Sequence, residues 1–94
     1  MDKRITLENN QYKVTKNYKN SFNLEELKEK FTDYFEDFDF VVGDYAYGKL
    51  RLKGFCNKKN KRYKKINDYL LIDEYIKKDC AYDCAYYILE KVNK

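Results

Sequence analysis

The sequence predicts an α+β fold in which two helices pack on a mostly antiparallel sheet, in the order β-β-α-β-β-α-β. Several short segments alternate apolar and polar residues and are separated by turns that contain Asn and Gly, which is typical of antiparallel strands. Residues 24–38 instead repeat their apolar positions at helical spacing. A chain of 94 residues can bury one hydrophobic core but not two, so residues 1–94 are expected to form a single domain.

The first elements are a hairpin and a helix. Residues 4–8 and 12–18 alternate, and the Asn9-Asn10 pair between them tolerates the positive φ of a tight turn. Asn23 is the predicted N-cap of the helix, and Glu26 follows it at the spacing of a capping box. The apolar face of this helix is expected to comprise Leu24, Leu27, Phe31, Tyr34, Phe35 and Phe38. The acidic residues between them, and Asp37 and Asp39 at the end, are expected to face water.

A second hairpin follows the helix. Residues 38–42 are a predicted strand and residues 43–48 its turn, with Gly43 and Gly48 as the turn residues. In the next strand, apolar and cationic side chains alternate with a period of two, which places them on opposite faces of the sheet. The core face should carry Leu50 and Leu52, and the other face Lys49, Arg51 and Lys53.

The remaining segments complete the order of elements. Residues 57–62 are too polar for a core and indicate an exposed, mobile loop. A second helix is expected to begin near Asn67, because apolar residues then recur at helical spacing. Residues 80–84 form a predicted connector, and residues 85–92 form the predicted last strand.

Composition excludes several classes of protein. No apolar run approaches the length of a membrane span, and the first residues lack the apolar core of a signal peptide, so a cytoplasmic protein is expected. The chain has no His, which removes the commonest general base and the commonest metal ligand. No nucleophile, phosphate-loop or metalloprotease motif occurs either. The expectation is therefore a protein that is not an enzyme and that needs neither a cofactor nor a metal ion.

The three cysteines are unevenly spaced along the chain. Cys80 and Cys84 are separated by three residues rather than the two of zinc and thioredoxin-type sites, and Cys56 is distant in the sequence. A reducing cytoplasm favours their interpretation as small buried apolar residues. A redox pair of Cys80 and Cys84 is the less favoured alternative.

Residues 40–55 resemble the signature of the YutD-like family of small bacterial proteins. The matching positions are an apolar pair before Gly-Asp, an aromatic residue, a Tyr two residues further, and then a Leu-Arg-Leu-Lys-Gly-Phe run. In this chain they are Gly43, Asp44, Tyr45, Tyr47, Leu50, Arg51, Leu52, Lys53, Gly54 and Phe55. The resemblance spans nearly the whole chain and includes Cys80, Cys84, Tyr86 and Tyr87. Two positions depart from the family pattern, because Tyr45 replaces a Trp and Asp83 replaces a Gly. The resemblance implies a cytoplasmic bacterial protein and supplies no biochemical function.

Charge is distributed unevenly along the chain. Residues 45–65 carry nine basic side chains and no acidic one, whereas residues 24–44 carry eight acidic and two basic side chains. One interpretation is that the two segments solvate their own faces or neutralise each other. The other is that the basic segment creates a local positive field that attracts an anionic partner.

The preferred functional hypothesis is a binding module that contacts RNA or a ribonucleoprotein through residues 49–65, since cations neutralise phosphates and aromatic rings stack on bases. The alternative is a protein–protein adaptor or regulatory factor that binds an acidic partner. Arg51 can either pair with Asp44 across the hairpin or present its guanidinium to a phosphate or carboxylate. The candidate binding residues are Tyr45, Tyr47, Lys49, Arg51, Lys53, Lys58, Lys59, Lys61, Arg62, Lys64 and Lys65.

Overall fold

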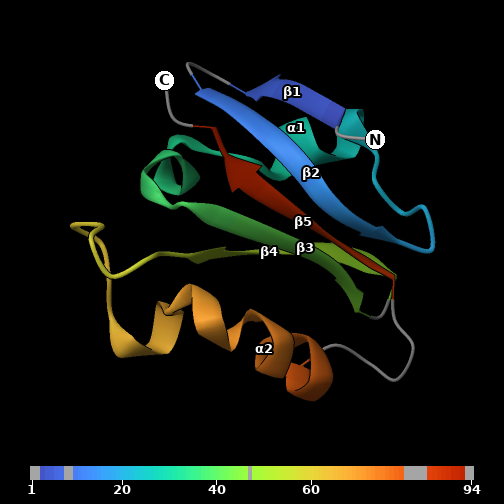
Figure 1. The fold of residues 1–94 in the computed structure, drawn as a ribbon. Coiled ribbons are helices and arrows are strands. Elements are labelled where there is room, and N and C mark those ends of the chain that lie inside the picture. The colour runs from blue at the N-terminus through green and yellow to red at the C-terminus, as the bar shows by residue number, and fades with distance from the viewer. Residues whose placement is uncertain (1–2, 8–9, 47, 80–84, 93–94) are drawn as a thin grey trace.

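A computed structural model describes residues 3–7, 10–46, 48–79 and 85–92, and its core is a five-stranded antiparallel sheet (Figure 1). The strands are β1 (Lys3–Leu7), β2 (Asn10–Tyr18), β3 (Phe40–Ala46), β4 (Lys49–Phe55) and β5 (Tyr86–Lys91). The α-helices are α1 (Leu24–Lys30) and α2 (Ile72–Asp79), and short 3-10 helices are η1 (Asp33–Asp37), η2 (Lys65–Asn67) and η3 (Tyr69–Leu71). The predicted α+β class and the order β-β-α-β-β-α-β of strands and α-helices are confirmed.

The last strand lies in the middle of the sheet. The strand order is β1-β2-β5-β3-β4, so β5 pairs with β2 on one side and with β3 on the other, antiparallel in both cases. Leu89 illustrates the arrangement, because it lies between Val14 of β2 and Val41 of β3 and is fully buried. The two hairpins β1–β2 and β3–β4 are thus joined into one sheet by β5, and β4 forms one edge of the sheet.

Each face of the sheet is covered by one α-helix. Side chains alternate along β3, so Val41 packs in a cluster with Leu27 and Phe31, whereas Val42 packs with Ile72 on the opposite face. The first cluster lies beneath α1 and the second beneath α2, and Figure 1 shows the sheet between the two helices. Within the part of the chain that the structure describes, no helix is long and apolar enough to cross a membrane.

The first helix is shorter than predicted. Asn23 is its N-cap as expected, and its Oδ1 accepts a hydrogen bond from the Glu26 amide at 3.1 Å. The helix ends at Lys30, because Phe31 has an extended backbone with ψ 125°, and the chain resumes as η1 after Thr32. Phe31 and Phe38 are both buried. Apolar spacing alone could not reveal the break, since two short helical segments bury these rings as well as one long helix would.

Gly43 is not a turn residue, contrary to the prediction. It lies in the middle of β3, opposite Leu52 of β4, and a Cβ atom on Gly43 would be 2.5 Å from Cζ of Tyr87. The ring of Tyr87 therefore occupies the space that a side chain would need. Gly48 is the turn residue. Its φ is +76°, and it is the residue immediately before β4.

The segment after β4 also differs in detail from the prediction. Two 3-10 turns, η2 and η3, precede α2, which begins at Ile72 rather than near Asn67. Asp68 separates these turns, and its Oδ1 accepts a hydrogen bond from the Leu70 amide at 3.0 Å. This amide, with the hydroxyl of Tyr63, holds the pKa of Asp68 below its usual value. The predicted connector at residues 80–84 lies outside the described residues.

Candidate binding surface

Two of the three cations of β4, Arg51 and Lys53, contact specific partners rather than pointing freely into water. Arg51 lies directly opposite Asp44 in the β3–β4 register, and its Nη2 donates to Asp44 Oδ2 at 2.6 Å. Asp44 is fully buried, whereas the Arg51 side chain is 44% exposed. The hydroxyl of Tyr75, from α2, donates to the other carboxylate oxygen of Asp44 at 3.2 Å. Of the two roles considered for Arg51, the structure thus contains the pair with Asp44.

Lys53 lies further along the same face of β4, where α2 covers part of it. Its Nζ is 5.5 Å from the ring centroid of Phe55 and 5.8 Å from that of Tyr75. These distances are in the range of cation–π contacts. Leu50 is buried on the opposite face of β4, and Leu52 packs beside it. The predicted division of β4 into a leucine face and a cation face is confirmed, but the cation face also packs against α2.

The basic loop, residues 57–62 after β4, is anchored to Asp37 and Asp39, which precede β3. The carboxylate of Asp39 accepts hydrogen bonds from the Asn57 amide at 2.9 Å and from Asn60 Nδ2 at 3.0 Å. Asn60 Nδ2 also donates to the carbonyl of Asp37 at 2.7 Å, and Arg62 forms an ion pair of 3.0 Å with the Asp37 carboxylate. Asp39 therefore does not simply face water, contrary to expectation. The loop is exposed, as predicted, but these contacts fix its course.

Six lysines of the basic segment remain exposed after these contacts. Within the described residues they form no ion pair with an acidic side chain, whereas Arg51 and Arg62 do. These six are Lys49, Lys58, Lys59, Lys61, Lys64 and Lys65. With Arg51, Lys53 and Arg62 they form what we call the basic surface. The acidic and basic segments thus neutralise each other only in part.

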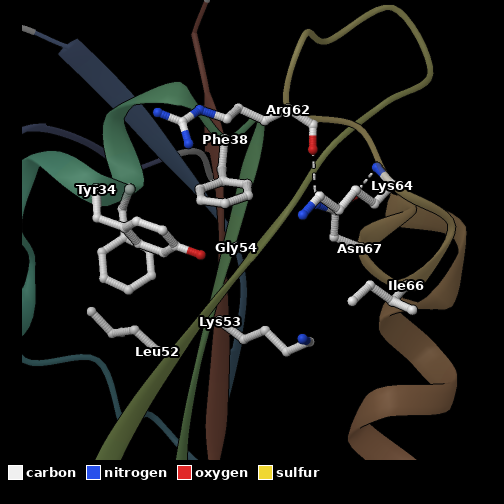
Figure 2. A pocket seen from close by; sticks show the side chains of 10 residues that line it. Tyr34, Phe38, Leu52, Lys53, Gly54, Arg62, Lys64, Ile66 and Asn67 are labelled. Carbon is white, nitrogen blue, oxygen red and sulfur yellow. Dashed lines mark hydrogen bonds between the residues drawn. The ribbon is translucent and has the colours of Figure 1, made fainter.

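A cleft of about 340 Å³ opens beside β4 within this surface (Figure 2). Tyr34 and Phe38, from the η1 region, and Leu52 of β4 line one side of it. Lys64 and Ile66, which follow the basic loop, line the other side, and the Arg62 side chain extends from the loop over Phe38. We call this the β4 cleft. Its walls combine aromatic rings with cations, which suits a ligand that is both apolar and anionic.

Tyr45, one of the two aromatic residues proposed as contacts, does not line this cleft. Tyr45 is half-buried, and its hydroxyl donates to the carbonyl of Ser21 at 3.2 Å and to the carboxylate of Glu26. Burial, and then the hydrogen bond to Glu26, raise the pKa of Tyr45 to about 12. Tyr45 therefore joins β3 to α1 instead of facing a partner. Tyr47 lies outside the described residues.

Sequence reasoning missed the apolar residues of the cleft. Ile66 is 74% exposed, although isoleucine is usually buried, and Tyr34 is exposed at 58% where a core position was expected. A signal for Ile66 was present in the sequence, because it is a single large apolar residue directly after the basic run. No local signal placed Tyr34 near Ile66, since the two come from segments that only the fold brings together.

The cysteines give no second site within the described residues. Cys56 is a free thiol and fully buried, as the preferred interpretation predicted, and burial raises its pKa. Cys80 and Cys84, the candidates for a redox pair, lie outside the described residues. The part of the chain that is described contains no cluster of three or more Cys, Asp or Glu side chains able to hold a metal ion.

Comparisons with known proteins agree with the resemblance carried by residues 40–55. A family model described as "Putative antitoxin YutD-like" matches residues 6–90. The chain is 36% identical over 90 residues to "Putative antitoxin YutD" of Bacillus subtilis strain 168, an alignment that covers 96% of this chain and 99% of the relative. The solution structure of protein yutD from B. subtilis superposes with a TM-score of 0.81 at 35% identity, covering 98% of this chain and 84% of that one.

Proposed function

This chain belongs to the YutD-like family, and from that premise we propose that it is a non-catalytic binding protein of the cytoplasm that holds an acidic partner protein on its basic surface. Residues 1–94 act in this proposal as a single domain. The observation that carries it is the positive charge left over by the fold. Asp37 and Asp44 neutralise two arginines of the basic surface, and six lysines of this surface stay exposed.

The name of the relative supports a protein as partner. The B. subtilis relative is called "Putative antitoxin YutD", and an antitoxin counteracts a toxin. The β4 cleft supports the same class of partner, because aromatic walls beside cations suit an apolar side chain flanked by carboxylates. A positive surface also speeds the encounter with an acidic partner, and more strongly at low salt.

RNA is the second candidate partner, and the exposed lysines favour it. Lys58, Lys59 and Lys61 follow one another closely on the anchored loop, which is a suitable arrangement for contacts to phosphates. The aromatic part of the RNA hypothesis has less support, since Tyr45 turns towards α1 and the Tyr63 hydroxyl donates to Asp68 at 2.8 Å. RNA binding would therefore rest on charge, with little readout of bases.

The proposal is tested by affinity capture from native lysate with chemical crosslinking, with and without nuclease. The test variant is Lys58→Gln/Lys59→Gln/Lys61→Gln, which removes three loop charges but keeps the Arg62–Asp37 pair. The control is Lys16→Gln/Lys28→Gln/Lys30→Gln, which removes three exposed charges outside the basic surface. We expect one protein to crosslink to both the wild type and the control variant, and its binding to persist after nuclease treatment. Its affinity for the loop variant should be about tenfold lower.

Two outcomes contradict the proposal. A partner that binds the loop variant as tightly as the wild type would show that the basic surface is not its site. A partner that nuclease removes would assign the surface to RNA. In that case, titration with mixed RNA at two salt concentrations should give an affinity that falls steeply with salt, and more weakly for the loop variant.

A further inference from the structure

The outer edge of β4 has backbone groups that the sheet does not use. Among the described residues, β4 pairs with β3 only, in a register without irregularities. The amide and the carbonyl of one residue in a strand point to the same side, and the side alternates from residue to residue. Cys56, the residue after β4, directs its amide to Asn67 O and its carbonyl to the Tyr69 amide, both at 2.8 Å, on the side away from β3. By this alternation Leu50, Leu52 and Gly54 also face outwards.

The chain already places a short piece of extended backbone on this edge. Cys56 and Asp68 form an isolated parallel bridge, the only pairing on the outer side of β4 or its continuation among the described residues. The preceding residue of β4 whose backbone groups face outwards is Gly54, which lines the β4 cleft. The edge is therefore paired at Cys56 and has no partner strand from Gly54 towards Lys49 among the described residues, and we call that stretch the open edge.

Clefts lie on both faces of this open edge. The β4 cleft of about 340 Å³ lies on the side of Leu52, Tyr34 and Phe38. A second cleft of about 250 Å³ lies on the side of α2, between Lys53, Phe55 and Tyr75. Lys53 and Ile66 line both clefts. An extended peptide directs successive side chains to opposite faces, so a strand added at this edge would place alternate side chains in the two clefts.

The charges of β4 select the occupant. A second copy of this chain, paired edge to edge, would bring the cations Lys49, Arg51 and Lys53 close to the same cations of its partner, and like charges in cross-strand positions destabilise a sheet. An acidic strand would gain from the same cations. The aromatic cleft on the other face requires apolar side chains.

We infer that the open edge of β4 is a strand-addition site for an extended segment of a partner protein in which apolar and acidic residues alternate. The apolar side chains enter the β4 cleft, and the acidic ones lie beside Arg51 and Lys53. This inference rests on the proposed function and specifies how the partner is held.

The test uses a synthetic peptide in which Glu and Val alternate, titrated into the isotope-labelled full chain and followed by NMR. We expect hydrogen exchange of the outward amides of Leu50, Leu52 and Gly54 to slow by about tenfold or more. The amides of Arg51 and Lys53, which face β3, should change little. A peptide with Lys in place of Glu is the charge control. Two further peptides carry N-methyl groups on the backbone amides, one at the Glu positions and one at the Val positions. Only one of these two peptides should lose binding, because in an added strand only every second backbone amide faces β4.

Protein variants separate this mode of binding from simple attraction of charge. Lys53→Glu should weaken the Glu peptide about tenfold and improve the Lys peptide, whereas Lys58→Glu, which reverses a charge on the loop, should change both much less. Amide spectra recorded without peptide verify that each variant is folded.

The outcomes distinguish this inference from the proposed function. If the peptide leaves the β4 amides unprotected and the partner is still lost with the loop variant described above, the strand-addition site is wrong and the proposed function stands. Protection at Leu50, Leu52 and Gly54 that rises with protein concentration alone would assign the edge to a second copy and overturn the inference. Shifts limited to residues 58–65, with either the peptide or an RNA oligonucleotide, would also overturn it.

Discussion

Asp44 and Arg51 face each other across the β3–β4 hairpin, and Arg51 Nη2 lies 2.6 Å from Oδ2 of the fully buried Asp44. The other carboxylate oxygen accepts a hydrogen bond from Tyr75 of α2. Burying a carboxylate lowers the stability of the folded protein unless a cation balances its charge and both oxygens accept hydrogen bonds. Asp44 therefore ties α2 to the sheet as long as Arg51 and Tyr75 are present.

Arg51→Ala is expected to destabilise the protein by about 3 kcal/mol, because it leaves the Asp44 carboxylate buried without its counter-charge. Arg62→Ala is the matched control, since it breaks an ion pair in which both side chains are more than half exposed, and it should cost about 0–1 kcal/mol. Chemical denaturation gives both free energies of unfolding. Equal losses for the two variants would show that Asp44 is solvated and that the pair has no special role.

Gly43→Ala is expected to cost about 1–3 kcal/mol of stability, because the new Cβ would lie 2.5 Å from the Tyr87 ring and one of them must move. The matching double mutant is Gly43→Ala/Tyr87→Leu, in which a smaller side chain leaves room for the methyl group. Its loss of stability should be smaller than the sum of the two single losses. Simple additivity in thermal or chemical denaturation would contradict contact between these positions.

Asp39→Ala is expected to loosen the basic loop, because the Asn57 amide loses its acceptor and Asn60 Nδ2 loses one of its two acceptors. Two hydrogen bonds to a charged group suggest a loss of about 2 kcal/mol, and the Asn57 amide should exchange faster with solvent. Glu29→Ala removes an exposed acid of α1 and serves as the control. Unchanged exchange at Asn57 would mean that Asp39 does not hold the loop.

Alkaline pH should destabilise the protein through its buried tyrosines. Burial raises the pKa of Tyr12 to about 12 and also raises that of Tyr87, so the folded state keeps these phenols protonated when the unfolded chain, with a pKa near 10, has lost the protons. This stability is fully present below pH ~10 and is lost as the pH rises towards ~12. Near-ultraviolet absorbance should show these tyrosines ionising together with loss of circular dichroism.

Tyr87→Phe provides the control for this pH dependence. The Tyr87 hydroxyl is buried without a hydrogen-bond partner among the described residues, so its removal should leave stability at neutral pH nearly unchanged or slightly higher. The alkaline transition should move to higher pH, because one phenol fewer must ionise. A transition at the same pH as in the wild type would exclude Tyr87 as its source.

The sequence was most informative where local chemistry decides the structure. Asn23 has the hydrogen-bonding oxygen that a helix start requires, Gly48 adopts a positive φ, and the alternation at Leu50 and Leu52 separates the faces of β4. These features depend on neighbouring residues only. They were sufficient for the fold class and for the order of elements.

Features that depend on distant residues escaped prediction. Gly43 owes its place to Tyr87, 44 positions later in the chain, and nothing near Gly43 signals that ring. The position of β5 between β2 and β3 escaped prediction for a similar reason. Alternation of apolar and polar residues identifies a strand but does not reveal which strands it pairs with. The candidate surface was predicted as a run of cations, but its cleft depends on Tyr34 and Ile66, which the fold alone brings together.

The central position of β5 bears on how the protein forms during its synthesis. A nascent chain emerging from the ribosome presents β1–β2 and β3–β4 first, and these two hairpins have no strand in common until β5 follows. Until then β2 and β3 each expose an unpaired edge, which is a hazard for aggregation. Translation that stalls before Tyr86 would therefore leave a species that cannot assemble the sheet, and its two exposed edges would mark it for chaperones and proteases.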